Sequence, residues 1–174
     1  MDHSAIISRM QETPAAIGAL VSGLTASEFR HKPPSGAWSI VEITAHLVDE
    51  ERVDFRARLR STLEDPGRKW PPTDPEGWAR DRGYQSRELS PLVAEFARER
   101  EASLLWLRSL GNVDWKIAYI HPKVGPVTAG ELLVSWAAHD ALHVRQIAKR
   151  MFELAARDGE PEGFSTRYAG EWSA

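Results

Sequence analysis

Two segments of this sequence begin with the same signal for a long helix, and this signal constrains the fold more than any other feature. Ser39 and Glu42 have the spacing of a capping box, in which the serine oxygen accepts from a free backbone amide and the glutamate reaches back to the cap. Thr128 and Glu131 repeat this spacing. Apolar residues occupy the flanking staple positions of both boxes, namely Trp38 with Ile43 and Val127 with Leu132. Both starts are therefore well marked.

Four segments are predicted to be helical, and none reads strongly as a strand. They span roughly residues 4–24, 40–63, 90–110 and 128–157. In the first segment apolar residues recur at spacings of three and four, and Pro14 should kink it because proline removes a backbone donor. The third segment begins at Ser90, with Pro91 in its first turn, and stops at Gly111. The fourth stops before Gly159.

The segments between these helices set the expected topology. A long connection over residues 64–87 is punctuated by prolines and glycines, so we do not expect one continuous helix there. Trp70 and Trp78 indicate that it packs on the rest of the protein. Residues 112–127 should be irregular, and residues 159–174 should form a tail or a strap over the surface. We expect an all-α, single-domain chain over 1–174, a four-helix bundle with a long crossover connection between its second and third helices.

Composition excludes several classes of function. The 22 Lys+Arg and 25 Asp+Glu residues give a net charge of −3, without the basic excess that nucleic-acid binding favours. The absence of cysteine excludes disulfides, thiolate metal sites and a cysteine nucleophile. The longest uncharged stretch, residues 13–27, is too short for a membrane span, and the first residues lack the pattern of a signal peptide. We therefore expect a cytoplasmic protein without a nucleic-acid or membrane partner.

Two of the six histidines, His139 and His143, are four residues apart in the fourth predicted helix. This spacing places them one turn apart on one face, where both rings can reach a single metal ion. On spacing alone, two partly buried histidines that are satisfied by hydrogen bonds are the favoured interpretation. Their position changes this balance, because Leu132, Trp136 and Ile147 lie on the same face. Buried imidazoles need a partner for their nitrogens, and a metal ion supplies one.

His46 is the candidate for a third ligand. It interrupts an apolar run, from Ala45 to Val48, in the second predicted helix. Two histidines from one helix and one from another would form a three-histidine site on facing helices, as bundles do. Three neutral imidazoles leave at least one coordination position open, which is typical of a catalytic ion.

Acidic residues near these histidines are candidates for a role in the site, and each has an ordinary alternative as a solvated or salt-bridged side chain. Glu50 lies one turn after His46 and is a candidate fourth ligand or general base, although a solvated residue is the first interpretation. Glu42 lies one turn before His46. Asp140 is a candidate to orient a ligand ring, and its alternative role is a salt bridge to an arginine of another helix.

The other histidines carry less weight. His3 is near the terminus, His31 is in a polar loop, and His121 precedes the last helix, where it could line the mouth of a site. Most of the seven tryptophans are expected to be core or loop anchors, with a minority that contacts substrate.

In their chain order, these motifs resemble the DinB-like (DinB/YfiT-like) family, in its DinB_2 branch. The second-helix motif reads Trp38-Ser39-Ile40-Val41-Glu42 and then His46-Leu47-Val48-Asp49-Glu50. The last loop and helix read His121-Pro122-x-x-Gly125-x-x-Thr128 and then His139-Asp140-x-x-His143-x-x-Gln146-Ile147. The resemblance extends from about residue 4 to residue 151, and its specificity lies in the ordered combination.

The resemblance implies a four-helix bundle with a long crossover and a divalent metal, zinc or nickel, held by His46, His139 and His143. It also implies a homodimer that acts on a small molecule. The better-understood relatives are thiol-dependent S-transferases and isomerases, so a thiol-dependent S-transferase is the leading expectation. Because this chain has no cysteine, the thiol would be an external low-molecular-weight cofactor. The alternatives are a metal-dependent hydrolase, a non-catalytic metal-binding or ligand-binding bundle of the stress response, or core histidines without a metal.

Overall fold

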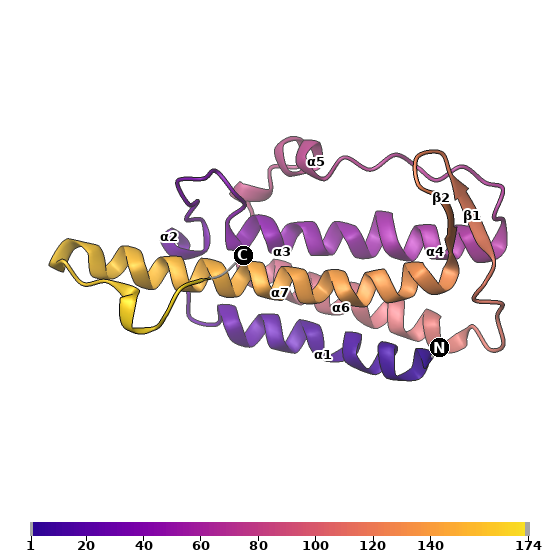
Figure 1. Ribbon diagram of the computed structural model, residues 1–174, viewed down its shortest axis with the longest axis horizontal. Coiled ribbons are helices and arrows are strands. Elements are labelled where there is room, and N and C mark those ends of the chain that lie inside the picture. The colour runs from indigo at the N-terminus through magenta and orange to yellow at the C-terminus, as the bar shows by residue number, and fades with distance from the viewer. Residues whose placement is uncertain (1, 173–174) are drawn as a thin grey trace.

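The structure is a computed structural model that describes residues 2–172. Its elements in chain order are α1 (His3–Val21), α2 (Ala26–Phe29), α3 (Ile40–Asp49), η1 (Glu50–Asp54), α4 (Phe55–Glu64), α5 (Pro75–Asp81), η2 (Tyr84–Ser86), α6 (Leu89–Ser109), β1 (Ala118–His121), β2 (Gly125–Thr128), α7 (Ala129–Gly159), η3 (Glu160–Glu162) and η4 (Thr166–Tyr168). The long helices lie side by side as a bundle in which α3, η1 and α4 form one continuous rod (Figure 1).

The direction of the helices confirms the predicted crossover. In Figure 1 the α3–α4 rod and α6 run one way, whereas α1 and α7 run the other way. The link over residues 65–88 returns along the whole bundle and carries α5 and η2. Both α1 and α3 pack against α6 and α7, so each ligand-bearing helix of the candidate site has neighbours on two sides.

Both predicted capping boxes are present. The Glu42 amide donates to Ser39 Oγ at 3.4 Å, and the Ser39 amide donates to Glu42 Oε2 at 2.8 Å. At α7 the Glu131 amide donates to Thr128 Oγ1 at 3.1 Å, and the Thr128 amide donates to Glu131 Oε2 at 2.7 Å. These side chains satisfy backbone donors that a helix start leaves free.

Three predicted helix ends were wrong by a short distance, the first at α1, which ends at Val21 rather than at residue 24. Helix α6 begins at Leu89 after the extended residue Glu88, so Ser90 is not its cap. Leu89 is buried in the core, and this tertiary contact draws the first turn two residues earlier. Helix α7 continues through Gly159, which keeps right-handed helical angles. The chain after it turns back toward α7 through η3 and η4, as expected of a strap (Figure 1).

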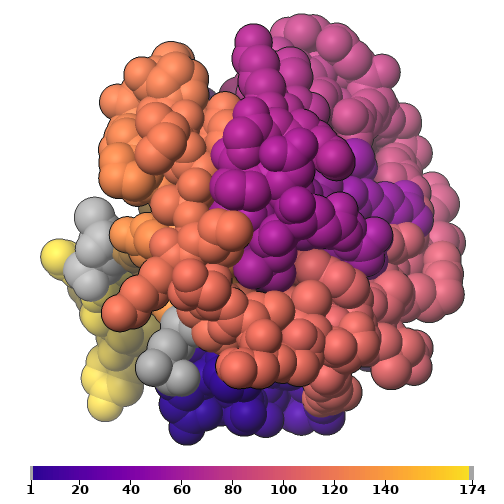
Figure 2. All heavy atoms as spheres, turned by 90° about the vertical axis from the view of Figure 1, so that its right-hand side faces the viewer, coloured from indigo at the N-terminus to yellow at the C-terminus, as the bar shows by residue number. Residues whose placement is uncertain are grey.

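Residues 112–127 are not wholly irregular, because they contain the antiparallel hairpin β1–β2. Tyr119 of β1 is buried and stacks on Trp70 of the long link with ring centroids 4.2 Å apart. Gly125, at φ +80°, supplies the left-handed conformation at the start of β2. Figure 2 looks onto this end of the bundle, where the chain after α6 and the hairpin lie above the start of α1. Prolines and glycines in residues 112–127 indicated an irregular segment, so the two short strands were not predicted.

The second predicted helix, which forms the α3–α4 rod, also departs from the prediction, because a π-helical turn interrupts it at Glu50–Asp54. A π turn contains an extra residue and therefore shifts the face that the following residues present. Glu50, Glu51 and Asp54 of this segment are all buried. No helix in the described part of the chain is both long and apolar enough to pass through a membrane.

The core divides into two apolar clusters along the bundle axis. One contains Ile17, Leu47, Phe96 and Ile147, and the other contains Met10, Leu59, Leu104 and Trp136, each with further residues. Between these positions the helices carry buried polar residues, among them Glu51, Arg100 and Asp140. The candidate site and its polar surroundings therefore occupy the middle of the bundle.

Candidate metal centre

Three histidines from two helices meet inside the bundle. His46 of α3 is 3 % exposed and His143 of α7 is 5 % exposed, while His139 of α7 is partly buried. The ring centroid of His46 lies 5.4 Å from that of His139 and 4.7 Å from that of His143. Each ring offers one nitrogen such that all of these atoms lie within 4.8 Å of one another. The convergence that the sequence suggested is present.

The protonation and hydrogen bonding of the histidine ring nitrogens fit the binding of a divalent ion. His143 Nδ1 lies 2.9 Å from Gln146 Oε1, an acceptor, so Nδ1 carries the proton and Nε2 keeps its lone pair. His143 Nε2 and His139 Nε2 are 3.0 Å apart. Among the described residues, His46 Nδ1 and His139 Nδ1 have no hydrogen-bond partner despite being buried. A cation held by one nitrogen of each ring would give these buried imidazoles a partner that the protein itself supplies only in part.

Electrostatics keep the three rings neutral at physiological pH. Burial, with help from the neighbouring imidazoles, lowers the pKa of His46 to about 2. Burial, His143 and then Arg100 lower the pKa of His139 to about 3. Burial also lowers the pKa of His143, although its bond to Gln146 opposes the shift. Neutral imidazole is the form that binds zinc or nickel, so no proton has to be removed first.

Glu50 is not the solvated residue of the first interpretation. Its side chain is 5 % exposed, and Oε1 lies 3.5 Å from His46 Nδ1. Burial, reinforced by Asp54, raises the pKa of Glu50 to about 8, so the carboxyl group is mostly protonated at neutral pH. Glu50 lies one turn after His46 on the same face of α3, so the regular helix already carries it to the core, and the π turn begins at this residue. Glu50 is beside the site but outside the converging set of histidines.

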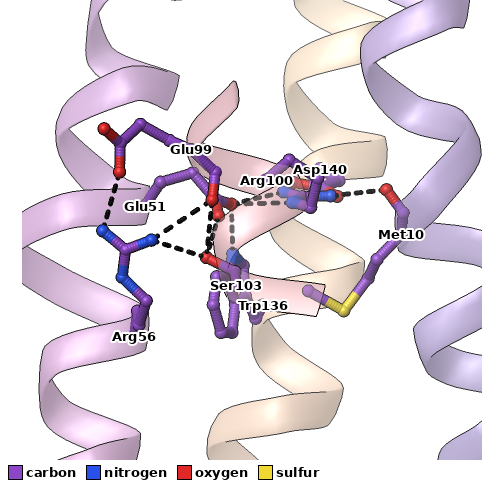
Figure 3. A network of polar contacts seen from close by, with 8 residues as sticks. All are labelled: Met10, Glu51, Arg56, Glu99, Arg100, Ser103, Trp136 and Asp140. Atoms are coloured by element: carbon purple, nitrogen blue, oxygen red, sulfur yellow. Dashed lines mark hydrogen bonds and ion pairs between the residues drawn. The ribbon is translucent and has the colours of Figure 1, made fainter. Parts of the chain in front are cut away.

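Asp140 takes the alternative role considered for it, a salt bridge to an arginine. Its Oδ1 and Oδ2 accept from Arg100 of α6, at 2.8 and 2.5 Å (Figure 3). The predicted bond from Asp140 to a ligand ring is absent from the contacts of the described residues. Its negative charge still acts on the site, because it favours the protonated form of His143.

The remaining candidates lie away from the three rings. His121 Nδ1 accepts from the Lys123 amide in the hairpin turn, and His3 lies against Trp115 with ring centroids 5.6 Å apart. Neither belongs to the converging set, and nor does His31. Glu42 completes the capping box at the start of α3 and forms an ion pair with Lys32 at 2.9 Å.

Aromatic side chains form the walls of the site. The Trp38 ring lies 4.9 Å from that of His46, and the Phe55 ring lies 5.1 Å from that of His139. Trp38 and Gln146 also line a recess of about 260 Å³, together with residues that include Ile43 and Arg150. Trp38 contacts His46 and Gln146 contacts His143, so this recess adjoins two of the three histidines. It has room for part of a small molecule.

Sequence reasoning missed the buried residues that surround Arg100. One signal was available, because Arg100 lies four residues after Phe96 and four before Leu104 and thus occupies an apolar face. A charged residue in such a position requires buried partners. Glu51 carried no such signal, since a regular helix would have placed it differently from the π turn.

Comparison with known proteins agrees with this arrangement. The DinB superfamily profile matches residues 9–147. A protein of Oceanobacillus iheyensis named "Putative metal-dependent hydrolase" is 27% identical over 143 residues, which are 81% of each chain. The "Putative metal-dependent hydrolase YfiT" of Bacillus subtilis is 23% identical over 147 residues, which are 82% of each chain.

The fold has a counterpart among solved structures. The structure of YfiT from Bacillus subtilis, described as "a probable metal-dependent hydrolase with an unusual four-helix bundle topology", superimposes with a TM-score of 0.79 at 19% identity. The match covers 88% of this chain and 87% of that one. The bundle predicted from the sequence is thereby confirmed.

Proposed function

Because this chain belongs to the DinB superfamily, we propose that it is a metal-dependent hydrolase of a small molecule, with His46, His139 and His143 as the ligands of one divalent ion. The observation that carries this proposal is the convergence of three buried nitrogens within 4.8 Å, two of them on rings with an unpaired Nδ1. The names of the two curated relatives support hydrolysis as the reaction.

The protein's own residues prepare the site in three ways. Gln146 accepts from His143 Nδ1 and so holds that ring in the tautomer with a free Nε2. Trp38 and Phe55 cover the rings of His46 and His139 and keep bulk water from these faces. Glu50 holds a proton beside His46 at neutral pH and is a carboxyl group available for a proton transfer. When bound, a divalent ion supplies Lewis-acid activation of a water, thiol or carbonyl oxygen at its open position.

Thiol-dependent S-transfer is the second proposal, and it uses the same open site. The absence of cysteine favours an external thiol if this reaction occurs, because the chain cannot supply its own. A divalent ion held by His46, His139 and His143 would lower the pKa of a thiol at its open position and so favour its nucleophilic form.

One experiment separates these proposals. Untagged protein is purified, its zinc and nickel content is measured, and the metal-loaded protein is offered a panel of esters, amides and model electrophiles with and without a low-molecular-weight thiol. Metal-dependent cleavage without thiol supports the hydrolase, and conjugation that requires thiol supports the S-transferase. Full metal loading without turnover would favour a metal-binding or ligand-binding bundle, and absence of metal would favour core histidines. His143→Ala is the inactive control.

We further propose that the protein acts as a homodimer in the cytoplasm. The family resemblance supports the dimer, and the cysteine-free sequence is compatible with a reducing compartment. Sedimentation velocity should give twice the mass of one chain, and fractionation of cells should place the protein with the cytoplasmic fraction. A monomer at micromolar concentration would contradict the first expectation.

A further inference from the structure

A fully buried arginine ties together the elements that carry the candidate ligands. Arg100 of α6 is 1 % exposed, and its five N–H donors all have acceptors (Figure 3). Nε and Nη2 donate to Glu51 Oε1 at 2.9 and 2.6 Å, whereas Nη1 and Nη2 donate to Asp140 at 2.5 and 2.8 Å. The remaining donor reaches the Met10 carbonyl oxygen at 2.7 Å. We call Met10, Glu51, Arg100, Ser103, Trp136 and Asp140 the Arg100 network.

The contact with α1 has a cause in the sequence. In a regular helix the Met10 carbonyl oxygen would accept from the amide of residue 14, but that residue is Pro14, which has no N–H. Arg100 Nη1 supplies the missing donor. The proline and the arginine, far apart in the sequence, therefore complete one hydrogen-bonding site.

The Arg100 network contacts the α3–α4 rod, which carries His46, at the π turn. Glu51 lies five residues after His46, and both of its oxygens are used. Oε2 accepts from Ser103 Oγ at 2.6 Å, and Oε1 accepts from Trp136 Nε1 at 2.8 Å as well as from Arg100. Glu51 is thereby bonded to α6 and α7 at once.

The contact with α7 flanks the other two histidines. Asp140 is next to His139 and less than one turn before His143, and Trp136 is one turn before Asp140. Both residues are at most 3 % exposed. The network is therefore bonded to α7 on either side of His139 and to the α3–α4 rod just beyond His46, and no member belongs to the converging set of rings.

We propose that the Arg100 network is the positioning device of the metal centre, holding η1 and α7 at the separation and rotation that make His46, His139 and His143 converge before an ion binds. This inference rests on the proposed metal centre. A fixed fork of donors suits this role, because a guanidinium group satisfies two carboxylates and a carbonyl oxygen in one plane. Groups that hydrogen-bond metal ligands typically change metal affinity by about ten- to a hundredfold when they are removed, and we expect the same range for this network, which bonds the residues next to the ligands rather than the ligands.

An alternative role, charge alone, makes a different prediction. The network has one positive and two negative formal charges, from Arg100, Glu51 and Asp140, and the net negative charge would attract a divalent ion. Arg100→Lys keeps every charge but replaces the planar fork by a single ammonium group. If charge alone mattered, this substitution would leave metal affinity unchanged.

The test is a titration of the metal-free protein with Co²⁺, read out as affinity and as the visible absorption band that reports coordination geometry. We expect Arg100→Lys to weaken Co²⁺ binding by about ten- to a hundredfold and to alter the band. Arg52→Lys is the matched control, because Arg52 also joins η1 to α6, through Glu95 and Glu99 at 2.6 and 2.9 Å. It makes no contact in the Arg100 network, so its affinity and band should equal those of the wild type.

The outcomes are decisive in both directions. A smaller loss of affinity, an unaltered band, or an equal loss in Arg52→Lys would overturn the proposal. If Arg100→Lys does not fold, as judged by circular dichroism, Trp136→Phe takes its place, because it removes the bond to Glu51, keeps every charge and retains a ring, although a smaller one, to stack on Phe55. The same change in affinity and band is then required. Failure of the wild type to bind Co²⁺ would instead refute the proposed metal centre.

Discussion

The histidines of the candidate centre are buried in a neutral form, and this has a direct consequence for each ring. His143 is the best residue to remove, because its Nδ1 is committed to Gln146 and its Nε2 faces His139. We expect His143→Ala to lose most of the bound metal while its helix content remains, since the core around it is mainly aliphatic. Elemental analysis and circular dichroism of untagged protein measure both quantities.

His121→Ala is the matched control for that substitution. His121 lies in the hairpin, where it accepts from the Lys123 amide, and it is outside the converging set of rings, so its removal should leave the metal content unchanged. Loss of metal in His121→Ala, or retention of metal in His143→Ala, would show that the ligand set has been assigned wrongly.

Glu50 gives the metal-free protein a characteristic dependence on pH. Its pKa rises from 4.5 in the unfolded chain to about 8 in the folded protein, so between these values the folded state holds a proton that the unfolded state releases. Stability should therefore fall as pH rises through this window, by up to about 1.4 kcal/mol per pH unit for one proton. His46, His139 and His143 act in the opposite direction, because folding lowers the pKa of each ring below the ordinary 6.5, and their effect fades about one pH unit above that value.

The histidines are common to the wild type and Glu50→Gln, so the difference between the two proteins isolates Glu50. We expect the urea midpoint of the metal-free wild type to fall relative to that of Glu50→Gln between about pH 7 and pH 8, because glutamine cannot ionise. Equal slopes for the two proteins in the presence of a chelator would show that Glu50 ionises normally in the folded state.

At the scale of single elements, the two capping boxes offer a comparison of the same interaction in different surroundings. Thr128 caps α7 at a partly buried position, and removal of such a cap costs about 1 kcal/mol. Ser39 is fully buried, and its hydroxyl also contacts Gln85 Oε1 at 2.6 Å. Ser39→Ala would leave that acceptor unpaired as well as the helix start.

We therefore expect Ser39→Ala to reduce the free energy of unfolding by more than Thr128→Ala, by about 2 kcal/mol against about 1 kcal/mol. Urea denaturation of both variants in the same buffer measures the difference. An equal loss would mean that the bond between Ser39 and Gln85 contributes nothing to stability.

The same elements show what could be predicted from the sequence and why. The capping boxes and the spacing of His139 and His143 are local patterns, so residues a few positions apart reveal them. The π turn is different, because its cause lies in contacts between distant residues such as Glu51 and Arg100. The sequence therefore predicted a helix at this place but the wrong surroundings for Glu50. The hairpin β1–β2 was missed because Tyr119 depends on Trp70, a residue of the long link.

At the scale of the whole molecule, the crossover link explains how two distant segments share one site. It brings α6 into the bundle parallel to the α3–α4 rod, and α6 then contacts α1 and α3 (Figure 1). Arg100 of α6 can consequently reach residues of α1, η1 and α7. The prolines and glycines of the link predicted its irregular path, but only the packed bundle reveals which polar groups meet between the two apolar clusters.

This arrangement makes the metal a part of the stability of the whole bundle. An ion that binds three side chains of two helices binds the folded state and not the unfolded chain, so it stabilises the protein by about 2.7 kcal/mol when its free concentration is a hundred times its dissociation constant. For a chain of this length, each kcal/mol corresponds to a change in melting temperature of about 2–4 °C. A chelator should therefore lower the melting temperature of metal-loaded protein by about 5–10 °C. His143→Ala should melt at the same temperature with and without metal, and a metal-dependent shift of equal size in this variant would place the stabilising ion at a different site.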